Sequence, residues 1–163
     1  MKDQEPPKAP TIPAKIRLNR SEKMGLPFLF LLPVLAVAGA FGPATEVVEG
    51  QTSSVGWSAE YPSRLRFQNS ERLNVRVQNR SQVTLAQVKL AFDPNYIHAF
   101  TTVAFDPAPS KSYEVELQNL APGESRLVSV QLAAEQYGPH KGWIALSDGQ
   151  EAARANLSTF IFP

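Results

Sequence analysis

Residues 73–92 read "LNVRVQNRSQVTLAQVKLAF", and apolar side chains alternate with polar ones through most of this stretch. A period of two is typical of β-strands that bury one face and expose the other. The polar run "NRSQ" at 79–82 separates the two alternating segments and predicts a turn. The stretch therefore predicts two strands joined by a short loop. The residues expected to point inward are Leu73, Val75, Val77, Ala86, Val88, Leu90 and Phe92.

The same alternation continues on both sides of this pair. It occurs in residues 55–61, 113–117 and 128–132, and again in "GWIALS" and "ARANLSTFIF" near the end of the sequence. The turn signals "FDPN", "FDPAPS" and "LAPGES" lie between these segments. We expect seven or eight strands over residues 54–163. The predicted fold class is all-β, an immunoglobulin-like antiparallel β-sandwich.

An uncharged segment precedes this domain, and residues 25–42 read "GLPFLFLLPVLAVAGAFG". As a helix it would be about 27 Å long, and the hydrocarbon core of a bilayer is roughly 30 Å thick. We expect one N-terminal transmembrane helix, an uncleaved signal-anchor, over residues 25–43. A cleaved signal peptide is the alternative, because "AVA" at 36–38 fits a signal-peptidase site, but the polar leader and the apolar segment are both long for one. The residues expected in the span are Leu26, Phe28, Leu29, Phe30, Leu31, Leu32, Val34 and Leu35.

The charges on the two sides of this segment predict its orientation. Residues 1–24 carry six basic and three acidic side chains, a net charge of +3, whereas residues 43–163 carry ten and twelve, a net charge of −2. By the positive-inside rule, the amino terminus is cytoplasmic and the sandwich is periplasmic, in a single-pass protein of a bacterial inner membrane. A linker is expected at 44–53. The basic residues expected to determine this orientation are Lys15, Arg17, Arg20 and Lys23.

The tail at 1–24 is rich in proline, with four prolines in the eight residues from Pro6 to Pro13. Such a segment favours an extended polyproline II conformation. It is interpreted either as a solvated topology signal or as a strap along the cytoplasmic side of a partner.

The sequence contains few residues that carry chemistry. It has no cysteine, which excludes disulfides, thiol nucleophiles and zinc–thiolate sites, and its two histidines, His98 and His140, are not at the spacing of a metal site. No nucleophile elbow, phosphate loop or zinc-protease motif occurs. The outer domain lacks the basic excess of a nucleic-acid binder. We therefore expect no catalytic residue, no metal, no cofactor and no small-molecule substrate.

Three short motifs occur in the predicted strands and turns: a "V-x-V-x-N" strand, an "L-x-P-G-E" turn, and a "G-x-H/Y" start of a late strand. Their positions are Val75, Val77, Asn79, Leu120, Pro122, Gly123, Glu124, Gly138 and His140. With these motifs, the sequence resembles bacterial immunoglobulin-like adhesion and scaffold domains of the CARDB type. The resemblance covers residues 54–160 approximately and implies a β-sandwich that binds proteins or surfaces and lacks catalysis.

Apolar residues in excess of one core predict contact surfaces. "TFIFP" places aromatic side chains on one face of the last strand and an isoleucine on the other, and "YIHAF" places three apolar residues in a loop, where they serve either an interface or their own loop. The candidate protein interface is Tyr96, Ile97, Phe100, Phe160, Ile161 and Phe162. Small residues suited to close helix packing are Ala36, Ala38, Gly39 and Ala40.

These features predict a non-catalytic accessory subunit of a larger bacterial membrane protein complex, such as a respiratory or photosynthetic assembly. Its partners would be integral membrane proteins and the lipid bilayer. The alternative is a free-standing, membrane-anchored envelope sensor or adhesin that binds a ligand through its sandwich loops. No residue identifies the partner.

Overall fold

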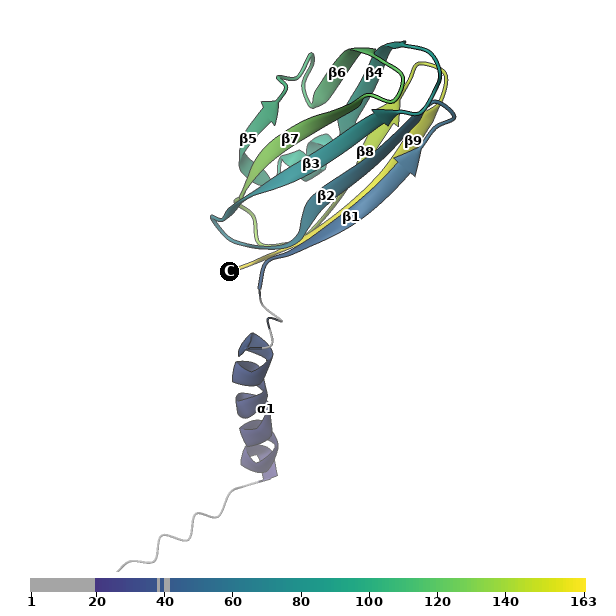
Figure 1. The fold of residues 1–163 in the computed structure, drawn as a ribbon. Helices are drawn as coiled ribbons and strands as arrows, with labels where there is room; N and C mark the ends of the chain where they lie inside the picture. Colours follow the sequence, from purple (N-terminus) through teal and green to yellow (C-terminus); the bar gives the residue numbers. More distant parts are fainter. Residues whose placement is uncertain (1–19, 38, 40–41) are drawn as a thin grey trace, which may run out of the picture. The chain divides into compact units, whose positions relative to one another are not determined.

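The computed structural model describes residues 20–37, 39 and 42–163, without the side chains of residues 20–26, 28, 32, 102 and 103. The part of the chain that is described forms two helices and nine strands (Figure 1). They are α1 (Arg20–Val37), β1 (Ala44–Gln51), β2 (Val55–Arg66), β3 (Ser70–Asn79), β4 (Leu85–Phe92), α2 (Pro94–Ile97), β5 (Phe100–Asp106), β6 (Glu114–Leu120), β7 (Ser125–Ala134), β8 (Gly138–Ser147) and β9 (Ala152–Phe162).

The strands form a two-layered β-sandwich, which confirms the predicted all-β fold. The hydrogen-bonded order is β5-β7-β3-β2-β9-β8-β4-β6, and β1 pairs with β2. One layer holds β1, β2, β3, β7 and β5, and the other holds β9, β8, β4 and β6 (Figure 1). The layers are joined where the last three residues of β2 pair in parallel with residues 160–162 of β9. All other pairings are antiparallel.

The core lies between the two layers, and the period of two in the sequence decides which side chains enter it. β2, β3 and β7 bury every second residue, as predicted. Trp57 is 3% exposed and packs beneath Gly50 of β1, where a Cβ would come within 2.5 Å of the indole ring. The predicted inward residue Ala86 is instead exposed, because β4 enters the core only from Val88 onward.

Asn79, at the end of β3, links the two layers by hydrogen bonds. Its side chain is fully buried, and its Nδ2 donates to the carbonyls of Val83 and Leu120, both at 2.8 Å. Its Oδ1 accepts from the backbone N–H and the hydroxyl of Ser81. The Asn79 carbonyl also accepts from the N–H of Gly123, whose φ of +74° suits glycine. Two of the motifs quoted from the sequence therefore form one hydrogen-bonded cluster.

Asp148 links the β8–β9 turn to the β1–β2 turn by hydrogen bonds. Its Oδ1 accepts from the N–H of Glu151 at 2.9 Å, and its Oδ2 accepts from the hydroxyls of Thr52, at 2.9 Å, and Ser54. Desolvation by burial raises the pKa of this carboxyl, but the hydrogen bonds from Glu151, Ser54, Gln150 and Thr52 outweigh it. The pKa of Asp148 therefore lies well below its usual range.

The predicted linker at 44–53 is wrong, because most of it forms β1. This strand pairs antiparallel with β2 along its whole length. Its side chains are exposed or half-buried. Because neither face of β1 is fully buried, the strand lacks the regular apolar alternation that identified the others.

The helix α1 occupies residues Arg20–Val37, whereas the sequence predicts one over 25–43. Its described side chains are mainly apolar and exposed, and they include Leu29, Phe30, Val34 and Val37. Among the helices that the structure describes, none combines the length and apolarity that crossing a membrane requires. Gly39 has a φ of +78° and donates to the carbonyl of Ala36. Several predicted features lie outside the described residues: the tail with Lys15 and Arg17, the side chains of Arg20, Lys23, Leu26, Phe28 and Leu32, and the residues Ala38 and Ala40.

Candidate interaction surface

The predicted aromatic loop belongs to the core, so the structure corrects the interface assigned to it. Tyr96, Ile97 and Phe100 are at most 4% exposed, and the first two belong to the short helix α2. α2 lies against β8 at Gly142, where a Cβ would come within 2.3 Å of the Tyr96 Cβ. The Tyr96 hydroxyl is hydrogen-bonded to Thr159 at 2.7 Å, and burial raises the pKa of Tyr96. These three residues stabilise the sandwich and are not available to a partner.

The side chains at the end of β9 alternate between the two faces as predicted, and one of these faces reaches the protein surface. Ile161 is fully buried, so its assignment to an interface is wrong. Phe160 is 41% exposed and Phe162 is half-buried, with ring centroids 4.7 Å apart. Both phenylalanines therefore lie on the outer face of the sandwich.

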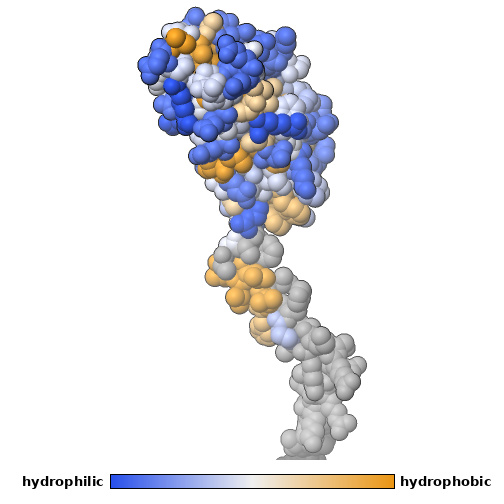
Figure 2. Space-filling view, turned by 90° about the vertical axis from the view of Figure 1, so that its right-hand side faces the viewer, coloured by the Kyte–Doolittle hydropathy of each residue, from blue (hydrophilic) through white to orange (hydrophobic). Residues whose placement is uncertain are grey.

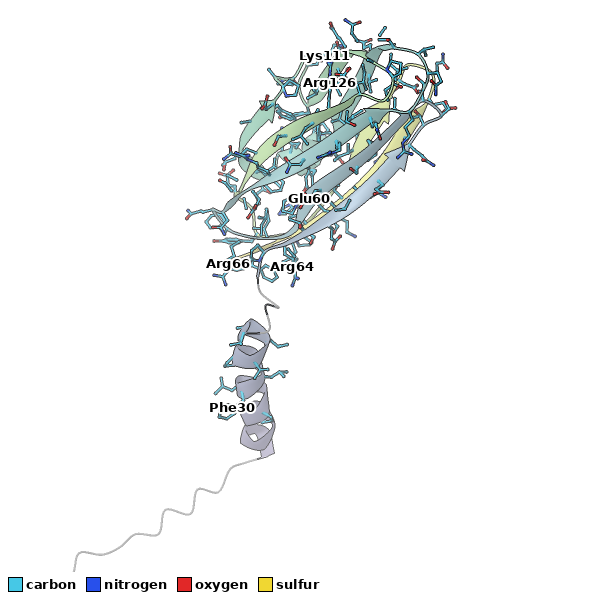
Figure 3. The ribbon with its side chains drawn as sticks, viewed as in Figure 1. Phe30, Glu60, Arg64, Arg66, Lys111 and Arg126 are labelled. Carbon is cyan, nitrogen blue, oxygen red and sulfur yellow. The ribbon has the colours of Figure 1, made fainter. Side chains whose placement is uncertain are left out.

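Two arginines flank this phenylalanine pair because of the strand register. In the parallel pairing of β2 with β9, Arg64 lies opposite Phe160 and Arg66 lies opposite Phe162. Leu65, between the arginines, is buried, so the arginines share the outer face with the phenylalanines. Figure 3 labels both arginines at the end of the sandwich where β1 begins and β9 ends.

A second aromatic pair continues this surface, and no pattern in the sequence predicts it. Tyr137 is 57% exposed, and its ring centroid lies 4.5 Å from that of Phe67. The Phe67 N–H donates to the Phe162 carbonyl at 2.8 Å, which joins the two pairs. Both residues stand in turns, where no periodicity signals exposure. We call the set the aromatic–arginine surface: Arg64, Arg66, Phe67, Tyr137, Phe160 and Phe162.

Other exposed apolar side chains stand apart from this surface. Val47, Val83 and Leu127 are between 54% and 63% exposed and lie on β1, on the β3–β4 loop and on β7. Figure 2 shows one face of the sandwich, where polar residues dominate and the apolar ones form small separate patches. Single exposed apolar residues are common on soluble domains and mark no site.

A shallow groove of about 400 Å³ crosses the outer face of β1, β2 and β3. Arg80 lies over Gly56 there and donates to the Gln51 Oε1 at 3.0 Å. Arg76 and Glu49 also line the groove. These side chains can form hydrogen bonds to a ligand.

The histidines lie apart and make local contacts. The His98 Nε2 is 3.0 Å from the Tyr113 hydroxyl, and the His140 Nε2 is 2.8 Å from the Gln136 carbonyl. Within the described residues, no group of three histidine, cysteine or carboxylate side chains is placed to hold a metal ion.

Comparison with known proteins yields structural likeness alone. No family model matches the sequence, and no curated protein is detectably similar to it. Among similar solved structures is a CARDB domain from Pyrococcus furiosus, crystallised in complex with di-metal ions, with 11% identity and a TM-score of 0.44 over 72% of this chain and 93% of that one.

Two further solved structures are similar over comparable shares of this chain. The sulfur carrier protein SoxY from Chlorobium limicola has 13% identity and a TM-score of 0.36, over 78% of this chain and 94% of that one. A β-glucosidase from Listeria innocua, in complex with gluconolactone, has 15% identity and a TM-score of 0.36, over 75% of this chain but only 16% of the enzyme. These likenesses concern the β-sandwich and carry no substrate or activity over to this chain. The domain that begins at β1 is thus a β-sandwich similar to CARDB domains.

Proposed function

We propose that this protein is a non-catalytic accessory subunit of a larger bacterial membrane protein complex. Residues 25–42 stay in the membrane, the amino terminus lies in the cytoplasm, and the sandwich lies in the periplasm. The observation that carries this proposal is the run of eighteen uncharged residues that follows Lys15, Arg17, Arg20 and Lys23.

The side chains of α1 support an apolar environment for this segment. Leu29, Phe30, Val34 and Val37 are all exposed in the isolated chain, at 62% or more. At 100° per residue these four positions lie within about 140° of one another, and Leu31 and Leu35, at 48% and 36% exposed, widen the apolar arc to about 240°. Phe28 and Leu32 occupy helix positions in the remaining arc, so the sequence from 25 to 37 is apolar on all sides of α1. A helix that is apolar all round requires lipid or partner helices on every side. The small residues at 36–40 would allow a partner helix to approach closely.

The sandwich supports a binding role more than a catalytic one. Its conspicuous surface feature is aromatic and cationic, and aromatic residues and arginine are enriched where proteins meet other molecules. Its shallow grooves are lined by side chains that can form hydrogen bonds to a partner. The sandwich would brace the periplasmic side of the complex while the span holds it in place.

Co-purification with matched helix variants tests this proposal. The chain is extracted from bacterial membranes in a mild detergent, and mass spectrometry identifies the proteins that migrate with it. Integral membrane proteins in fixed ratio are expected with the wild type. The double variant Ala36→Leu, Ala40→Leu keeps the segment apolar but blocks the close approach of a partner helix, so these membrane proteins should no longer co-purify with it. The control Leu29→Ile, Leu31→Ile keeps the segment apolar and keeps the small residues, so the same membrane proteins should still co-purify with it.

A wild-type chain that migrates alone after mild extraction would contradict the proposed role. That result would favour the alternative, a free-standing sensor or adhesin.

A further inference from the structure

We propose that the aromatic–arginine surface rests on the anionic headgroups of the bilayer that holds residues 25–42. This inference deepens the proposed function and depends on it in one respect, because residues 25–42 must first be in the membrane. It adds a contact that the span alone does not require, because the end of the sandwich that carries this surface would lie on lipid.

The geometry of the surface suits a flat, amphipathic environment. The tilted rings of Phe160 and Phe162 have centroids 4.7 Å apart, and those of Phe67 and Tyr137 have centroids 4.5 Å apart. Tyr137 and Phe160 are the most exposed of the four rings, at 57% and 41%. Aromatic rings of this kind bury their apolar bodies at the boundary between headgroups and acyl chains, and a tyrosine hydroxyl remains hydrated there.

The charges beside the rings are complementary to lipid phosphates. Arg66 is exposed and lies next to Phe162 in the β2–β9 register. A guanidinium matches the geometry of a phosphate with two parallel hydrogen bonds. Further along the same outer face, β8 and β9 contribute Lys141 and Arg154, both exposed. Asp93 lines a pocket with both of them, so this part of the outer face carries two cations beside one carboxylate.

Several carboxylates lie near this end. Glu71 lines a small pocket with Arg64, Glu135 is exposed just after β7, and Glu46 accepts from the Tyr61 hydroxyl near the start of β1. None of these three residues belongs to β8 or β9. An anionic membrane would thus favour contact through the β8–β9 side.

The number of residues between α1 and β1 sets an upper limit on how far this end can lie from the segment proposed to be in the membrane. β1 begins at Ala44, opposite Arg64 in the register, only seven residues after Val37. Seven residues of extended chain reach at most about 25 Å. β9 ends at this same end of the sandwich (Figure 1). The turns that contain Val83 and Gly149 lie at the opposite end, beyond the length of the strands.

Tryptophan reporters in a vesicle of known composition test the contact. The full chain is reconstituted in phosphatidylcholine vesicles with one quarter phosphatidylglycerol, with or without lipid brominated near the headgroup. Phe160→Trp adds an indole on the proposed contact, and Val83→Trp adds one at the far end, where Val83 is 63% exposed. Trp57 and Trp143 give the same background in both variants.

The expected result is that bromine quenches the added Phe160→Trp fluorescence by roughly half, as for an indole at headgroup level, and leaves the added Val83→Trp fluorescence unchanged. Tyr137→Trp is a second reporter, should Phe160→Trp fail to fold, and it should be quenched too. Adding Arg66→Gln should reduce the ratio of docked to undocked sandwich about fivefold in these vesicles, with no change in vesicles of phosphatidylcholine alone.

Flotation of the vesicles separates the two possible failures. A chain that does not float with the vesicles refutes the membrane anchoring of the proposed function. A chain that floats, but whose reporters at 137 and 160 are quenched no more than the one at 83, overturns the lipid contact alone. A photocrosslinking residue at 160 that captures a protein instead of lipid in native membranes would also overturn it, since the surface would then be a protein interface.

Discussion

Replacing Asn79 by alanine should destabilise the sandwich more than any other exchange of a single polar side chain. The side chain is fully buried and takes part in four hydrogen bonds, two of them donated at 2.8 Å to the carbonyls of Val83 and Leu120. The carbonyl of Val83 also accepts from the Ser81 hydroxyl, so it keeps a partner. The Leu120 carbonyl and the Ser81 N–H each lose one.

The magnitude follows from these losses. Each buried group left without its partner costs about 1–3 kcal/mol, and the truncation adds a small cavity. We expect Asn79→Ala to lower the free energy of unfolding by about 2–4 kcal/mol. With a slope of roughly 2 kcal/mol per molar urea, the unfolding midpoint would fall by roughly 1–2 M.

The assay is urea unfolding of the full chain in a mild detergent, followed by the fluorescence of Trp57 in the core and Trp143 on β8. Asn156→Ala, on the exposed face of β9, is the matched control and should change stability by less than about 0.5 kcal/mol. Equal midpoints for Asn79→Ala and the wild type, at equal slopes, would refute the claim that this hydrogen-bonded cluster holds the two layers together.

Two further predictions concern the turns and the core. Because the folded-state pKa of Asp148 is lowered, its contribution to stability is present above the unfolded-state pKa of about 4 and is lost as the pH falls through the folded-state pKa. Asp148→Asn should therefore be less stable than the wild type in urea at pH 7, and the difference should shrink at pH 3; a difference independent of pH would contradict this. Gly142→Ala places a Cβ against Tyr96 and should cost about 1–3 kcal/mol by overpacking. Thermal unfolding measures this loss of stability, with Lys141→Ala at an exposed neighbouring position as the control. Equal transition temperatures for the two variants would show that α2 moves to accommodate the added Cβ without a loss of stability.

Alternation predicted the strands and their inward faces well where a strand has one buried face. β3 and β7 bury Val75, Val77, Val128 and Val130 as expected. It failed for β1, which covers residues predicted as a linker, since an edge strand with two partly exposed faces leaves no period of two.

The candidate surface was harder to predict because burial depends on contacts distant in sequence. Nothing in "YIHAF" shows that Gly142, more than forty residues later, leaves room for Tyr96. For β9, alternation separated Phe160 and Phe162 from Ile161, but only the pairing with β2 and β8 decides which face is inward. The same pairing brings Arg64 and Arg66, about a hundred residues earlier, beside the phenylalanines.

The central claim is that residues 25–42 remain in the membrane as part of the mature chain. Bacterial membranes washed at alkaline pH retain integral proteins, so the intact mass of the chain in the washed membrane and in the periplasmic extract tests the claim directly. We predict that the chain is found in the washed membrane and that its mass includes residues 25–42. A chain in the periplasmic extract whose mass begins at Gly39, after "AVA", would contradict the account.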